Sequence, residues 1–199
     1  MTLFFCTFSS QGLPADTVSV ENGAIFTECL RWPLIIDPQL QGISWVKTRE
    51  EQNNLKVIRL GQKNMLDVLE RCIENGNPVL IENIGESVDA ILGPVIGRKT
   101  IKKGHDLYVT LGDKEVLYSK NFRLFLHTKL SNPHYQPELQ AETTLINFMV
   151  TEEGLEEQLL ALVVRKERPE LEQQKADLIQ QQNDFKIRLK KLEANVLHK

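Results

Sequence analysis

The chain has 199 residues, which is room for one domain or for one domain with an appendage. Apolar residues make up 41% of it, which favours a packed core and excludes a disordered chain. The formal net charge of −3 argues against a general attraction to nucleic acid or to an anionic membrane. The three cysteines are widely spaced and show no metal-ligand pattern, which favours a reducing, intracellular compartment.

Residues 1–11 stay unassigned. They begin MTLFFCTFSS, an apolar stretch without an early positive charge. It is too short to span a bilayer, which takes about 20 residues. Three interpretations remain open: a first strand, a signal peptide, or a start that cuts into a longer protein. No other segment is expected to cross a membrane.

Residues 12–151 alternate short apolar runs with turns and amphipathic segments. Strands are expected at residues 32–37, 55–60, 78–83, 107–111, 115–118, 122–126 and 145–150. Helices are expected at 43–52, at 65–73 with Gly76 as the C-cap, and at 89–96. Gly112-Asp113 indicates a hairpin, whose loop Lys114 is expected to widen. Strands alternating with helices predict an α/β fold with a mostly parallel sheet flanked by helices.

Residues 152–199 are dense in charge and glutamine and contain no glycine after Gly154. The pattern predicts one long helix, or two that are interrupted at Pro169. Leucines and one phenylalanine follow the proline at intervals of seven: Leu171, Leu178, Phe185 and Leu192. The positions that would complete a second stripe are polar: Gln174, Gln181, Arg188 and Asn195. Two interpretations stay open, a terminal surface helix or one arm of an antiparallel coiled-coil hairpin.

Ligands of parallel α/β folds bind beyond the carboxyl ends of the strands, which directs attention to residues 37–39, 82–83 and 127–129. No phosphate loop of the form G-x-x-x-x-G-K-[ST] occurs, and the nearest string, residues 93–100, has its glycines too close together. Glu82-Asn83 has the shape of an acidic strand end that has lost one carboxylate. A buried, hydrogen-bonded Glu82 is therefore expected, and the basic residues Arg98, Lys99, Lys102 and Lys103 are expected to form a solvated turn.

Zinc and nucleophile signatures are absent from the sequence. None of the four histidines lies four residues from another, and no serine or cysteine elbow occurs. No catalytic residue and no metal ligand is therefore expected.

A set of strings resembles, in order and spacing, the fifth AAA+ module of dynein heavy chains. Among them are RWPLIIDPQ at 31–39 and NPHYQPE at 132–138. The others lie at residues 12–16, 21–23, 111–113, 145–151, 154–160 and 167–172. The strings at 31–33 and 132–135 look more like axonemal than cytoplasmic dyneins. Residues 1–11 do not resemble the family, and 130–164 contain no Arg or Lys, so no arginine finger is visible there.

The resemblance implies a domain organisation and a set of degenerate site positions. Residues 12–151 would form the AAA+ large subdomain, and 152–199 would begin the small helical subdomain and the first coiled-coil arm of the strut (or buttress). Asp37, Pro38 and Gln39 would lie where an active module has its phosphate loop. Glu82 and Asn83 would occupy the magnesium-holding position, and Thr128 the polar sensor position. No cofactor is expected for this chain, because ATP and Mg belong to the parent motor.

The expected function is a structural and allosteric element of a motor ring that links ATP-driven changes to the stalk, without its own ATPase site. The implied partners are the neighbouring AAA+ modules, the stalk through the strut and, indirectly, microtubules, with no nucleic acid and no membrane. The implied location is the cytoplasm and cytoskeleton, in the axoneme of a cilium. Two alternatives are a nucleotide hydrolase with an unorthodox site at Asp37, Glu82 and Thr128, and a stand-alone coiled-coil adaptor that dimerises.

Overall fold

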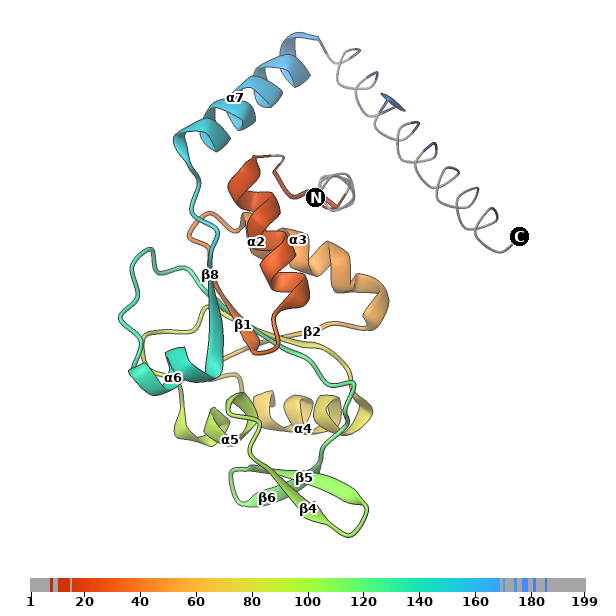
Figure 1. Ribbon diagram of the computed structural model, residues 1–199, viewed down its shortest axis with the longest axis vertical. Coiled ribbons are helices and arrows are strands. Elements are labelled where there is room, and N and C mark those ends of the chain that lie inside the picture. Colours follow the sequence, from red (N-terminus) through yellow and green to blue (C-terminus); the bar gives the residue numbers. More distant parts are fainter. Residues whose placement is uncertain are drawn as a thin grey trace, which may run out of the picture.

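A five-stranded parallel sheet forms the centre of the molecule (Figure 1). The computed structural model describes residues 8, 11–14, 16–168, 170, 174, 177, 178, 181 and 185. The strands are β1 (Trp32–Ile36), β2 (Lys56–Arg59), β3 (Val79–Glu82), β7 (Leu124–Thr128) and β8 (Thr143–Asn147). Their order is β2-β3-β7-β1-β8, with every neighbouring pair parallel. The predicted α/β fold with a parallel sheet is confirmed, and the predicted strands at 122–126 and 145–150 are each displaced by about two residues.

Helices cover both faces of this sheet (Figure 1). Two lie on one face, α2 (Thr17–Glu28) and α3 (Gln41–Glu50), the latter continued by a 3-10 turn (Glu51–Asn53). The other face carries α4 (Met65–Asn75), a 3-10 turn (Ala90–Leu92) with α5 (Gly93–Ile96), and α6 (Pro137–Glu142). The predicted cap of α4 is confirmed, because Gly76 has φ 74° and its N–H bonds to the carbonyl of Cys72.

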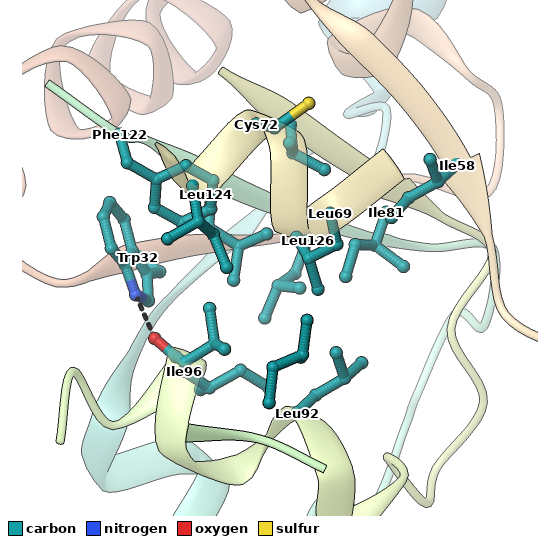
Figure 2. Packing of buried hydrophobic residues seen from close by; sticks show 14 of the residues in the cluster. Trp32, Ile58, Leu69, Cys72, Ile81, Leu92, Ile96, Phe122, Leu124 and Leu126 are labelled. Carbon is teal, nitrogen blue, oxygen red and sulfur yellow. Dashed lines mark hydrogen bonds between the residues drawn. The ribbon is translucent and has the colours of Figure 1, made fainter. Parts of the chain in front are cut away.

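Two hydrophobic clusters result, because successive residues of a strand point to opposite faces. Leu34 and its neighbours Leu124 and Leu126 join the cluster on the α4 side, which Figure 2 shows together with Leu69 and Leu92. Ile35 points the other way, into a cluster with residues of α2 and α3: Val20, Phe26, Ile43, Trp45 and Val46. A sheet buried on both faces is what the continuous apolar runs of the sequence predict.

A separate antiparallel sheet lies beyond α4 and α5 (Figure 1). It consists of β4 (Thr100–Lys103), β5 (Asp106–Leu111) and β6 (Lys114–Leu117). The predicted hairpin is present, but Lys114 does not widen its loop, because Lys114 pairs with Leu111 and leaves a two-residue turn at Gly112, with φ 62°. Lys102 and Lys103, expected in a solvated turn, belong instead to the edge strand β4. All four residues of β4 are exposed, so the segment lacks the alternation of buried apolar and exposed polar residues that predicts a strand from sequence.

At the C-terminal side, α7 (Glu152–Glu167) is capped by Thr151, whose hydroxyl accepts the N–H of Gly154 at 3.1 Å. It ends at Arg168, with φ −143° and ψ 67°. Arg168 thus lies outside helical geometry, so the predicted interruption of the helix is confirmed at the residue before Pro169, where a following proline disfavours the α conformation. Further along, the structure describes only six residues, all helical: 170, 174, 177, 178, 181 and 185. Leu171 and Leu192 of the predicted seven-residue spacing lie outside the described residues.

At the N-terminal side, Phe8 is helical and buried, in edge contact with Trp45 at 5.3 Å between ring centroids. A first strand is therefore wrong for this position, and residues 1–7, 9 and 10 lie outside the described residues. Within the described part of the chain, no helix has the length and apolar character needed to cross a membrane.

Candidate functional site

A cavity of about 260 Å³ lies at the carboxyl edge of the sheet, beyond β2, β3 and β7. Its lining residues come from four elements and the loops that follow them: Leu40, Ile43, Ser44, Lys47, Arg59, Glu82, Asn83, His127 and Lys129. Of the six predicted positions, Glu82 and Asn83 line this cavity. The other four, Asp37, Pro38, Gln39 and Thr128, do not.

The carboxylate of Asp37 is bound to the first turn of α3. It accepts the N–H of Gln41 at 3.0 Å and the N–H of Ile43 at 2.9 Å, and the residue is fully buried. The N-terminus of a helix presents unpaired N–H groups and a partial positive charge, which together attract anions. Asp37 therefore supplies from the protein itself the anion that this helix terminus attracts.

The turn between β1 and α3 spans four residues, 37–40, and is closed by a backbone hydrogen bond. The N–H of Leu40 bonds back to the carbonyl of Asp37 at 3.3 Å, and Leu40 itself has φ 64°. Gln39 is exposed and accepts a hydrogen bond from the side chain of Gln41 at 3.2 Å. The glycine at 42 is explained by packing, because a Cβ there would lie 2.8 Å from the ring of Phe148.

Glu82, at the end of β3, is buried and hydrogen-bonded, as predicted. Its two oxygens pair with Lys47 Nζ at 2.5 Å and with Arg59 Nε at 3.1 Å. Burial alone would raise the pKa of Glu82, but the hydrogen bonds and charges of Lys47 and Arg59 outweigh burial and lower the pKa. Glu82 is thus held ionised, with both oxygens already engaged by cations.

Thr128 faces away from the cavity. Its hydroxyl donates to the carbonyl of Ile84 at 2.9 Å and accepts the N–H of Leu130 at 3.2 Å, in a fully buried position. These bonds fasten β7 to the segment that follows β3. Because neighbouring residues of a strand point to opposite faces, His127 lines the cavity in its place.

His127 is 1% exposed and lies between the ends of β1 and β3. Its Nδ1 accepts the N–H of Asn83 at 3.3 Å, and Asn83 adopts φ 57° in doing so. Its Nε2 is buried without a well-formed hydrogen bond to any described residue. Burial lowers the pKa of His127, although the Asp37 and Glu82 carboxylates oppose this effect.

Seven of the nine lining residues were not predicted as site positions, and four of them carry a charged or imidazole side chain: Lys47, Arg59, His127 and Lys129. His127 and Lys129 were within the strand-end range 127–129 to which the sequence directs attention. Lys47 was not predictable in this way, since one lysine on an amphipathic helix is usually a solvated surface residue. Across the described residues, no group of three or more His, Cys, Asp and Glu side chains is placed to hold a metal ion.

The fold and the family match together define a class of protein: an α/β module of the AAA+ type, in which the Asp37 carboxylate caps the helix that follows β1. The family model of the ATP-binding dynein motor region matches residues 6–199. The chain therefore belongs to the dynein heavy chain family, as the resemblance predicted.

Curated relatives place the chain among axonemal members of that family. It is 65% identical over 189 residues to the dynein alpha chain of the flagellar outer arm of Chlamydomonas reinhardtii, covering 95% of this chain. It is 59% identical to the ciliary dynein beta chain of Tripneustes gratilla and to human dynein axonemal heavy chain 17, over 190 and 191 residues, covering 96% of this chain in each case. The chain spans about 4% of the length of these relatives. The predicted axonemal subtype and location agree with these flagellar, ciliary and axonemal relatives.

Proposed function

We propose that this chain is a structural and allosteric module of an axonemal dynein motor ring and has no ATPase site of its own. The observation that carries the proposal is the Asp37 carboxylate on the first turn of α3, bonded to the N–H groups of Gln41 and Ile43. A nucleotide phosphate would have to displace a carboxylate that is covalently part of the protein. No glycine-lysine loop compensates for that loss.

The state of Glu82 supports the same proposal. Phosphate-transfer sites of this class use a carboxylate at a strand end to hold magnesium and its water. Here the Glu82 oxygens are paired with Lys47 and Arg59. Binding magnesium would break both pairs, and the next residue, Asn83, offers an amide instead of a second carboxylate.

The proposed output of the module is the helical segment from α7 onward. The described apolar side chains past Pro169, Leu178 and Phe185, are 65% and 63% exposed. Two large apolar side chains seven residues apart on a helix are suited to packing against a partner helix. We assign this segment to the first arm of the strut, through which ring changes would reach the stalk and, indirectly, microtubules. The other partners proposed are the neighbouring AAA+ modules.

Calorimetry of the purified chain with Mg-ATP and Mg-ADP tests the absence of a nucleotide site, with circular dichroism as the check of folding. The expected result is no heat of binding from a folded chain. A dissociation constant in the range of about 1 μM or tighter would overturn the proposal and favour the hydrolase alternative. In that case Lys47→Met should abolish binding if the cavity is the site, whereas Lys102→Met, on the exposed strand β4, should not.

Measuring the mass of the isolated chain in solution distinguishes the adaptor alternative from the proposed ring module. An adaptor that uses its helix to pair with a second copy predicts a dimer in sedimentation equilibrium. The ring module predicts that Leu178→Asp and Phe185→Asp leave the mass unchanged, because their partner lies elsewhere in the motor.

A further inference from the structure

A second cavity, of about 270 Å³, lies at the opposite, amino edge of the sheet, where β1 and β7 begin. Five of its lining residues are cations: Arg31, Arg49, Arg98, Lys120 and Arg123. They come from four separate places in the sequence, so the fold assembles the cluster. This set of residues is called the arginine pocket below.

The positive charge of the arginine pocket is only partly neutralised. Arg123 forms a two-pronged pair with the buried Glu50, at 3.1 and 2.5 Å, and Arg49 lies 3.7 Å from the same carboxylate. No described carboxylate lies within ion-pair distance of Arg31, Arg98 or Lys120. One buried carboxylate thus serves two arginines and leaves three lining cations without an acidic partner.

Arg98 is held in place at some conformational expense. Its guanidinium stacks 3.8 Å from the centroid of the Trp32 ring, a cation–π contact. The ring is itself fixed, because its Nε1 donates to the carbonyl of Val95 at 3.1 Å, which Figure 2 draws as a dashed line. Arg98 has φ 50°, a conformation that side chains other than glycine seldom adopt and that gathers at binding sites.

Arg49 is fixed in a similar way from the other side of the pocket. It lies 5.6 Å from the Phe26 ring centroid and 5.3 Å from that of Trp45, and it donates to the Thr27 hydroxyl at 2.6 Å. Arginines that are already positioned lose little side-chain entropy when they bind a carboxylate. The pocket is therefore preorganised for an anion, with aromatic rings between the cations.

We propose that the arginine pocket is a docking site for an acidic segment of a polypeptide, whose carboxylates pair with Arg31, Arg98 and Lys120. Guanidinium forks match carboxylates in geometry as well as in charge. A nucleic acid fits less well, because its phosphates call for a basic stripe along the surface, whereas these cations converge on one cavity. The inference does not depend on the proposed lack of a nucleotide site, which concerns the other edge of the sheet.

Fluorescence anisotropy tests the proposal on the 199-residue chain, with a labelled peptide of glutamates around a central phenylalanine as the probe. The expected result is saturable binding that weakens as salt is added and that is absent for the same peptide with glutamine in place of glutamate. Arg98→Glu and Lys120→Glu should each weaken binding about tenfold or more. Lys102→Glu makes the same charge change on exposed β4, outside the pocket, and should leave binding within about twofold.

The variant Arg98→Gly distinguishes a loss of binding from a loss of folding. Glycine accepts φ 50° without strain, so this variant should remain folded by circular dichroism and still lose the affinity. No saturable binding of the glutamate peptide would overturn the proposal. Equal losses in Lys102→Glu and Lys120→Glu would also overturn it, because they would show attraction to general surface charge. Stronger competition by a single-stranded oligonucleotide than by the unlabelled peptide would assign the pocket to nucleic acid instead.

Discussion

Asp37 shows how one side chain decides what an edge of a sheet is able to do. The residue follows β1, where a mononucleotide-binding fold needs glycines that let the backbone approach a phosphate. With a short acidic side chain there, the chain turns directly into α3 and ties its own carboxylate to two N–H groups. The sequence located this position but not its geometry, because the two bonds depend on how tightly residues 37–40 turn.

Removing the Asp37 carboxylate should destabilise the protein. Asp37→Ala leaves two N–H groups of the α3 terminus without their acceptor, and we expect a loss of about 2–3 kcal/mol in the free energy of unfolding. Asp37→Asn keeps one acceptor oxygen and should lose less. Urea unfolding followed by circular dichroism measures both. Glu21→Ala, an exposed change on α2, serves as the control, and an equal loss there would refute the role given to Asp37.

His127 should make stability depend on pH near neutrality. Burial lowers its pKa, so on acidification the unfolded chain takes up a proton at the ordinary value of 6.5 before the folded chain does. The contribution of the neutral ring is complete above that pH and is lost as the pH falls below it toward the lower folded pKa. Urea midpoints between about pH 7.5 and pH 5.5 should fall, and His127→Gln should flatten the fall. His105→Gln, on the exposed hairpin, should preserve it.

At the scale of elements, the sequence predicted the buried parts of the molecule well and the exposed parts poorly. The strands at 32–37, 55–60 and 78–83 are continuous or alternating apolar runs, and burial on the sheet gives such runs their signal. Strand β4 and helix α6 have no apolar periodicity of their own and are fixed by pairing and packing, so they were missed. Helix α2 was missed because its three buried residues, Val20, Gly23 and Phe26, include a glycine.

The sequence predicted where along the chain the candidate site lies, but not which side chains face the cavity. The three strand ends were located from composition and turns. Which of two neighbours faces the cavity depends on the alternation of side chains along β7, which places His127 and not Thr128 in the lining. The pairing of Glu82 with Lys47 joins a strand end to a helix 35 residues earlier, and no local pattern predicts such a contact.

The cap of α4 offers a test at this scale. A Cβ on Gly76 would lie 2.7 Å from Ser119 Oγ and 3.0 Å from Asn121 Cβ, in a residue with φ 74°. Gly61 has φ 84° and open space around it. Gly61→Ala should therefore report only the conformational strain, about 1 kcal/mol, and Gly76→Ala should lose about 1–2 kcal/mol more in thermal or urea unfolding. Equal losses of unfolding free energy in the two variants would show that Ser119 and Asn121 move aside for the added Cβ at no cost in stability.

At the scale of the whole molecule, the proposed role of the helical segment is testable only in a heavy chain that contains a complete ring. There, Leu178→Asp together with Phe185→Asp should uncouple ATP turnover from microtubule affinity, because charge is placed on a seam meant for a partner helix. Gln173→Asp with Gln180→Asp adds the same charge two residues after each seam leucine, away from both stripes of the predicted seven-residue repeat, and should leave coupling intact. Microtubule-stimulated ATPase and co-sedimentation measure the two quantities, and unchanged coupling in the Leu178 and Phe185 variant would refute the assignment.

The Asp37 carboxylate, bound at the N-terminus of α3, differs from a diffusing ligand in how its occupancy depends on concentration and time. A freely diffusing ligand obeys mass action, so the sites it visits fill and empty as its concentration changes. A tethered group is present at a fixed and high effective concentration and is never released. Under the proposed function, the occupancy of this helix terminus does not vary with the supply of nucleotide. Any change of shape in the module would then be imposed by its neighbours in the ring and not by a nucleotide of its own.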